Sequence, residues 1–154
     1  MFSNEAVAKL VNDSFISAWT NRSPKTKFKD GLYQKLDART VDTYALGNGV
    51  TNITAVFALP DGTVLNAVPG YLDAAAFEVE VKFALELRDK VTDAKGRLKE
   101  GGAKVIAEAH RARSKDGRGP FTAMSHRKLA EAGLLTLDKV GADYFKEFAP
   151  GKTG

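Results

Sequence analysis

The sequence predicts an α/β fold, in which a strand and a later β-hairpin form a small sheet, helices pack on it, and an all-helical C-terminal part follows. Two runs of apolar and β-branched residues, 52–59 and 63–68, flank a Pro-Asp-Gly turn at 60–62 and indicate the hairpin. Asp73 is a good N-cap, and apolar residues recur at helical spacing over 77–87. Because the apolar arc of this helix is wide, we expect both the sheet and the C-terminal helices to pack on it.

Two elements are predicted near the N-terminus. Ser3 or Asn4 can cap a short helix, and Phe15–Thr20 has the aromatic and β-branched composition of a strand. A weak helical stripe follows over 32–46 before the hairpin begins.

The C-terminal third is predicted to be helical in short pieces. Val105, Ile106, Ala109 and Ala112 form one apolar stripe. Ser125 can cap a further helix that Gly133 ends, and aromatic residues mark a last helix over 140–148. We therefore divide the chain into residues 1–90, which contain the sheet, and residues 91–154, a helical extension packed on them.

Composition excludes several classes of function. The chain has 154 residues and no cysteine, which rules out thiol catalysis, dithiol redox chemistry and cysteine-ligated metal sites within this polypeptide. It contains no apolar run near the roughly 20 residues that a membrane span needs, and no signal-peptide pattern. We expect a soluble, cytoplasmic chain.

The order of these elements resembles the later part of a thioredoxin-like domain. The most specific pieces are Leu59-Pro60-Asp61-Gly62-Thr63-Val64 and Val68-Pro69-Gly70-Tyr71-Leu72. The resemblance covers residues 2–90 and is greatest to bacterial thioredoxin-family proteins with a helical extension. It implies a truncated thioredoxin-like domain, with Met1 as an internal start or a truncation of a longer chain.

The resemblance implies thiol-disulfide oxidoreductase activity for full-length relatives. Their Cys-x-x-Cys motif would lie upstream of this chain. A cis-proline that faces the active site in the family corresponds to the peptide-binding loop Asn52, Ile53 and Thr54. We expect no cis bond before Ile53, because such a bond costs roughly 2.5–4 kcal/mol without proline. The expected function is a redox-inactive binding or structural module with no cofactor, whose partner is a protein or peptide.

A basic segment supports an alternative function. Residues 95–128 hold ten Lys or Arg against three acidic residues, a balance of +7 in a chain of net charge +4. Its basic patch could neutralise phosphates and bind nucleic acid without sequence specificity. The patch consists of Arg111, Arg113, Lys115 and Arg118. A solvated helix face is the competing interpretation.

Other polar residues suggest no reactive centre. His110 and His126 are the only histidines, and a zinc site would also need carboxylates such as Glu108. Ser125 and His126 are adjacent on a predicted helix, where neighbouring side chains do not face each other. The carboxylates Glu78, Glu80 and Glu86 are predicted to lie on a solvated helix face. We expect no metal site and no catalytic residue.

Overall fold

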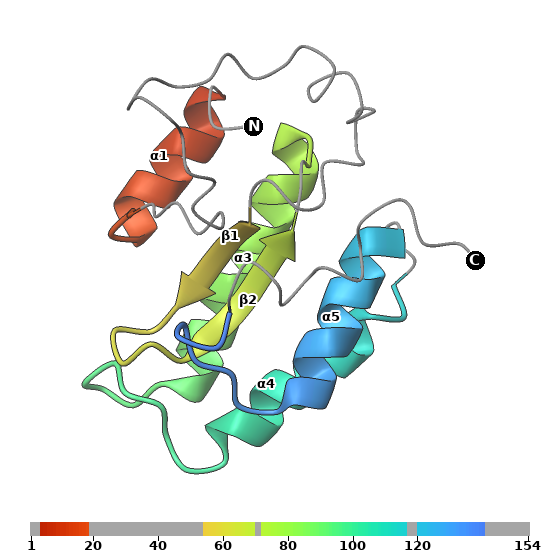
Figure 1. Cartoon of the computed structure of the whole chain (residues 1–154). Coiled ribbons are helices and arrows are strands. Elements are labelled where there is room, and N and C mark those ends of the chain that lie inside the picture. The colour runs from red at the N-terminus through yellow and green to blue at the C-terminus, as the bar shows by residue number, and fades with distance from the viewer. Residues whose placement is uncertain (1–3, 19–53, 70–71, 117–119, 141–154) are drawn as a thin grey trace, which may run out of the picture.

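The computed structural model describes residues 4–18, 54–69, 72–116 and 120–140, except for the side chains of residues 120 and 121. Within these ranges the chain is a mixed α/β structure with four helices and one antiparallel two-stranded sheet (Figure 1), which confirms the predicted α/β class. The elements are α1 (Glu5–Ser14), β1 (Thr54–Ala58), β2 (Val64–Pro69), α3 (Ala74–Val91), α4 (Gly102–Arg113) and α5 (Pro120–Ala132).

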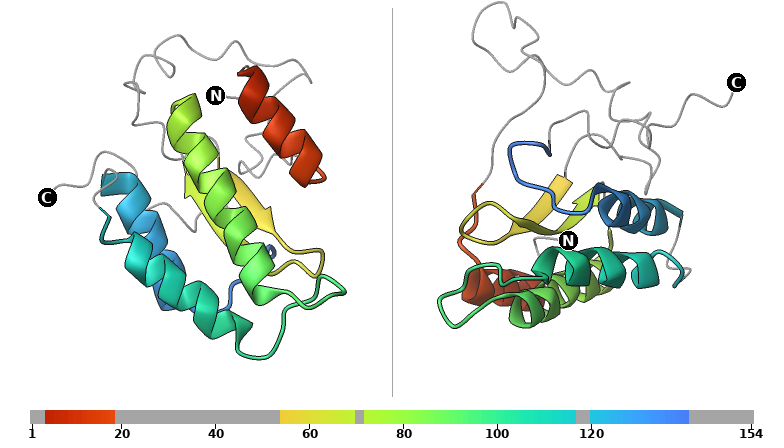
Figure 2. Two further views of the ribbon diagram at one scale, coloured as in Figure 1. Left: turned by 180° about the vertical axis from the view of Figure 1, so that it is seen from behind. Right: turned by 90° about the horizontal axis from the view of Figure 1, so that it is seen from below.

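The helices cover one face of the sheet and one of its edges. Figure 2 shows α1, α3 and α4 in one layer against the sheet, with α5 beside the strands. α3 packs on α1, β2 and α4, and α5 packs on β2 and α4. The apolar arc of α3 thus has the two predicted partners, the sheet and a C-terminal helix.

The predicted hairpin is confirmed. β1 and β2 pair from Thr54 opposite Pro69 to Ala58 opposite Val64. The turn is closed by the amide of Thr63, which donates to Asp61 Oδ1 at 2.9 Å. Gly62 has φ +87°, a conformation that glycine adopts without the strain a Cβ would cause.

Two helix starts also follow the sequence prediction. Asn4 Oδ1 accepts a hydrogen bond from the amide of Val7 at 3.1 Å, and Asp73 Oδ1 accepts one from Ala76 at 2.8 Å. These side chains satisfy amide groups that the first helical turn leaves unpaired. At the other end of the chain, α5 stops at Ala132 and is followed by Gly133 with φ +67°, as predicted.

The strand predicted at Phe15–Thr20 is wrong for residues 15–18, where the structure has no strand. The Phe15 ring packs on the Phe57 ring of β1, with centroids 5.3 Å apart, whereas Ile16 is fully exposed. The aromatic side chain therefore anchors this segment to the face of the sheet without a place in the strand ladder. Trp19, Thr20, the helix predicted at 32–46 and almost all of the one predicted at 140–148 lie outside the described residues.

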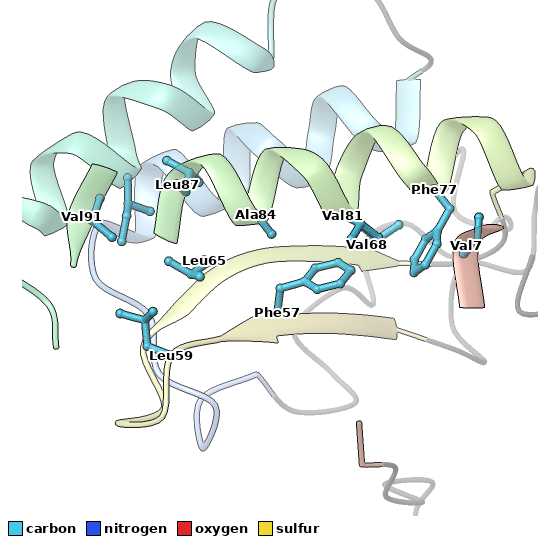
Figure 3. Close-up of a cluster of buried hydrophobic side chains, with 11 residues drawn as sticks. Val7, Phe57, Leu59, Leu65, Val68, Phe77, Val81, Ala84, Leu87 and Val91 are labelled. Atoms are coloured by element: carbon cyan, nitrogen blue, oxygen red, sulfur yellow. The ribbon is translucent and has the colours of Figure 1, made fainter. Parts of the chain in front are cut away.

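The main core lies between the sheet and the helical layer (Figure 3). It joins one face of the hairpin to α1, α3 and α4, and its buried members are Val7, Phe57, Leu59, Leu65, Val68, Phe77, Val81, Ala84, Leu87, Val91 and Ile106. Since Ile106 belongs to α4, the helical extension shares this core. A second, smaller cluster joins β2 to α5 and to the loop that follows it, through Val64, Ala67, Leu129, Leu135 and Val140.

Candidate functional site

Side chains from α4 and α5 cover the outer edge of β2. The β-ladder contains a bulge at Leu65, which has no register partner on β1. The carbonyl oxygen of Leu65 is 2.9 Å from His110 Nε2 of α4, and that of Ala67 accepts a hydrogen bond from Ser125 Oγ of α5 at 2.7 Å. A buried carbonyl without a donor is costly, so these two polar side chains complete the sheet at its edge.

The loop after α5 extends the same cover. The amide of Val64 donates to the carbonyl of Leu135 at 2.8 Å, and Thr63 forms a single antiparallel bridge with Thr136. β2 therefore has backbone or side-chain partners along its outer side as well as along β1. Its six residues are all buried.

The two histidines of the chain form a buried pair. His110 Nδ1 and His126 Nδ1 are 2.7 Å apart, and the two residues are 0% and 1% exposed. Because the carbonyl of Leu65 can only accept, His110 Nε2 must carry a hydrogen and donate it. The two facing Nδ1 atoms then share one proton, since a 2.7 Å contact leaves room for only one.

Glu80 of α3 completes the polar cluster, although it is only 2% exposed. Its Oε2 accepts a hydrogen bond from Asn66 Nδ2 at 3.0 Å and lies 3.1 Å from His126 Nε2. The latter contact is an ion pair whose N–H direction departs from good hydrogen-bond geometry. Arg113 Nη2 donates to the other carboxylate oxygen at 3.2 Å. One carboxylate thus meets groups from β2, α4 and α5.

Arg113 and Phe83 close the cluster on its remaining sides. The guanidinium carbon of Arg113 is 5.0 Å from the centre of the Phe83 ring, and its Nη1 is 3.9 Å from Asp116. Its buried Nε has no hydrogen-bond partner, so the ring face is one of its favourable contacts. Phe83 also meets both histidine rings edge to face, with centroids 5.2 Å apart in each case.

The contacts of the two histidines indicate where their protons lie. One proton lies on His110 Nε2 and one is shared between the Nδ1 atoms, and a third, on His126 Nε2, would face the Glu80 carboxylate. Three protons on four ring nitrogens give the pair one positive charge. Glu80 is the one carboxylate buried in the cluster, whereas Asp116 lies at the surface, 3.9 Å from Arg113 Nη1.

The pKa shifts agree with this assignment. Burial and the nearby His126 lower the pKa of His110 from 6.5 to about 4, against the opposing effects of the Leu65 carbonyl and Glu80. Burial acts to raise the pKa of Glu80, but His126, Asn66 and Arg113 together lower it to about 2. His110 is therefore neutral and Glu80 ionised at neutral pH.

The burial of Glu80 corrects the prediction that it lies on a solvated face. Along α3 the buried residues recur at helical spacing of three or four, with Glu80 next to Val81, and they are Phe77, Glu80, Val81, Ala84, Leu87 and Val91. Glu80 occupies a core position in this series, which is a signal the sequence does contain. Glu86 is exposed as predicted, and Glu78 forms an i,i+4 ion pair with Lys82 at 2.6 Å.

His110 likewise lies on the buried face of α4. The buried residues of this helix are Gly102, Ile106 and His110, each four positions after the last, whereas Ala112 of the predicted stripe is exposed. The buried face of α4 therefore lies at a different angle around the helix from the apolar stripe that the sequence predicts. A histidine four residues after Ile106 is the feature that could have indicated the pair.

The predicted capping role of Ser125 is wrong. α5 begins at Pro120, so Ser125 lies in the second turn of the helix. Its hydroxyl reaches the β2 carbonyl of Ala67, 58 residues earlier in the chain. Ser125 and His126 do not form a nucleophile–base pair, because each side chain is bonded to a different part of the cluster.

The structure separates the members of the predicted basic patch. Arg111 and Lys115 are exposed, whereas the Arg113 side chain is 14% exposed and pairs with Glu80. Arg118 lies outside the described residues. Arg113 therefore binds a buried carboxylate and does not belong to the exposed part of the patch.

The predicted peptide-binding loop is described only at Thr54. This exposed residue begins β1 and pairs with Pro69. Asn52 and Ile53 lie outside the described residues, which contain no cis peptide bond.

Within the described ranges, no group of three or more His, Asp or Glu side chains is arranged to hold a metal ion. Two nitrogens on one tetrahedral zinc lie about 3.3 Å apart, whereas the facing Nδ1 atoms are 2.7 Å apart. No described helix has both the length and the hydropathy needed to cross a membrane.

Comparison with known proteins gave no match to a family model, a curated protein or a solved structure. The thioredoxin-like resemblance therefore stays a prediction.

The cluster can hold a charge and exchange protons, but its polar side chains contact other groups of the protein and are shielded from solvent. His110, His126, Glu80 and Ser125 are all buried and bonded to one another or to β2. A general base or nucleophile must reach the atom on which it acts. The arrangement therefore holds α3, α4 and α5 against the edge strand.

Proposed function

We propose that this chain is a redox-inactive, thioredoxin-like binding module that acts without covalent or acid–base catalysis. The proposed binding surface is the start of β1, where Thr54 is exposed. The expected partner is an extended protein segment or peptide. The chain supplies no thiol of its own for exchange, since it contains no cysteine.

One observation carries the non-catalytic part of this proposal. The described side chains best suited to proton transfer or nucleophilic attack are His110, His126, Glu80 and Ser125, and all four are committed to the buried cluster. The thioredoxin-like part is supported by the packing of α3 on β2 and of α1 on α3, together with the Pro-Asp-Gly turn and the Asp73 cap. We infer a scaffold that presents a surface and does not turn over a substrate.

The test combines binding and activity on the full chain. The ¹⁵N-labelled protein is titrated with a reduced and carboxymethylated unfolded protein, and amide shifts are followed. We expect saturable changes at Thr54–Ala58, weakened by Thr54→Asp and retained in the control Glu86→Gln, which alters an exposed residue of α3. A parallel insulin-reduction assay should show no catalysis.

Two outcomes would overturn the proposal. Catalysed reduction of insulin disulfides would contradict a redox-inactive module. Absence of saturable shift changes at Thr54–Ala58, with the hairpin amides otherwise assigned and dispersed, would remove the binding role.

A further inference from the structure

The histidine pair is the point at which three separate elements meet. His110 belongs to α4, His126 to α5, and the carbonyl that accepts from His110 belongs to the bulged residue Leu65 of β2. The pair therefore links the α4–α5 helices to the sheet through a single proton between two Nδ1 atoms. Such a link holds only while a single proton lies between the two Nδ1 atoms.

We propose that the His110–His126 pair is an acid-released latch, which holds α4 and α5 over the outer edge of β2 while its Nδ1 atoms share one proton and opens when a second proton enters between them. This inference concerns conformational control and does not depend on the binding function proposed above.

The second proton cannot be accommodated in the observed geometry. With hydrogens on both Nδ1 atoms, two N–H groups would point at each other across 2.7 Å. Turning either ring to relieve this contact takes His110 Nε2 from the Leu65 carbonyl or His126 Nε2 from Glu80. The pair would also hold two positive charges in a buried space.

The charged groups around the pair come from each helix that packs on it. α3 contributes the Glu80 carboxylate, and α4 contributes the Arg113 guanidinium, with Asp116 beyond its end. α5 contributes His126 itself, and β2 presents only the uncharged Leu65 carbonyl and Asn66. The Glu80 carboxylate is thus already shared between Arg113 and the histidine pair, so a further proton on the pair has no second buried carboxylate to balance it.

The size of the response follows from proton linkage. A histidine in an opened segment titrates near 6.5, whereas His110 in the closed state has its pKa lowered to about 4. Between these values the open form binds one more proton, so acidification favours opening by up to tenfold per pH unit. The opening equilibrium should rise about 80-fold from pH 6.5 to pH 4, because the open form is half protonated at the first pH and the closed form at the second.

Amide hydrogen exchange of the full chain between pH 7 and pH 4 measures this opening. After correction for the intrinsic exchange rate, protection should fall in α4, in α5 and at the amide of Val64, which is bonded to the loop after α5. Protection in α1 and α3, which pack on each other within the main core, should fall much less.

A pair of variants separates the latch from general acid sensitivity. His110→Gln can still donate to the Leu65 carbonyl but does not titrate, so its α4–α5 protection should lose most of its dependence on pH in this range. Glu108→Gln, an exposed carboxylate two positions earlier on α4, should behave as the wild type. Should His110→Gln fail to fold, titration of the wild-type His110 ring nitrogens by NMR decides instead, with Nδ1 expected to stay unprotonated until about pH 4.

Three results would contradict the latch. These are unchanged α4–α5 protection down to pH 4, an equal loss of protection in α1 and α3, and protonation of His110 Nδ1 near pH 6.5 with the helices still closed.

Discussion

Glu80 Oε2 lies 3.1 Å from His126 Nε2, inside a cluster where Arg113 binds the other carboxylate oxygen at 3.2 Å. This ion pair joins α3 to α5, while the same histidine reaches α4 through its Nδ1 atom. Removing a buried carboxylate that faces a guanidinium and a histidine ring is costly, because the groups left behind stay buried without compensation.

Glu80→Gln should therefore lower the free energy of unfolding by about 3–5 kcal/mol. The substitution preserves the size of the side chain and an oxygen that can accept from Asn66, but removes the charge that Arg113 and His126 face. Urea denaturation at pH 7 measures the change. The matched control is Glu78→Gln, which breaks an exposed ion pair with Lys82 and should cost less than about 1 kcal/mol. Equal effects of the two variants would show that the buried cluster contributes no more than a surface pair.

Ser125→Ala should lower the free energy of unfolding by about 1–3 kcal/mol, because it leaves the buried carbonyl of Ala67 without the donor that Ser125 provides. Met124→Ala, one residue earlier and partly exposed, is the control for loss of helix surface. Thermal or urea unfolding compares the two. A Ser125→Ala variant as stable as wild type would mean that water or another donor satisfies this carbonyl.

Stability should fall as the solution is made acidic, in two overlapping steps. His110 has a folded pKa of about 4 against an ordinary 6.5, so the unfolded chain binds its proton more readily and stability is lost as pH falls from 6.5 to 4. The linkage is about 3 kcal/mol for this one group. Glu80, with a pKa of about 2, contributes stability that is present above its ordinary 4.5 and lost as pH falls toward 2.

Urea titrations at intervals from pH 7 to pH 3 test this profile. Asp93 and Asp138 also have lowered pKa values, but both carboxylates are accessible to solvent and therefore screened, so their effect should be small. A free energy of unfolding that is flat between pH 6.5 and pH 4.5 would contradict the assigned state of His110.

The structure lowers the expectation of nucleic-acid binding, since Arg113 of the basic patch is committed to Glu80. In a mobility-shift titration at low and high salt, we expect no salt-sensitive binding at micromolar protein. If binding did occur and were lost in an Arg111→Glu, Lys115→Glu double variant, the exposed part of the patch would be a nucleic-acid site. Glu86→Gln serves as the charge-change control on α3.

The local features of this fold could be predicted from the sequence, because each depends on residues a few positions apart. The Asp61-Gly62 turn, the Asp73 cap and the glycine after α5 are of this kind. They depend on backbone conformation and short-range hydrogen bonds, which residue type largely determines.

The buried cluster could not be predicted in the same way, because its partners are far apart in the chain. His110 bonds to a carbonyl 45 residues earlier, and Arg113 reaches Glu80 across 33 residues. Taken alone, Glu80 and His110 have the polarity of surface residues. Both residues lie three or four positions from other buried residues of their helix, and only this spacing indicates that they are interior. The spacing does not indicate which residue each of them contacts.

The most direct measurement of the central claim is a ring-nitrogen NMR spectrum of the ¹⁵N-labelled full chain at pH 7. The assigned hydrogen bonds predict His110 as a neutral ring with its proton on Nε2, which it donates to the Leu65 carbonyl, and with Nδ1 accepting from His126 Nδ1. A charged His110 ring, or one that carries its proton on Nδ1 and none on Nε2, would contradict the account.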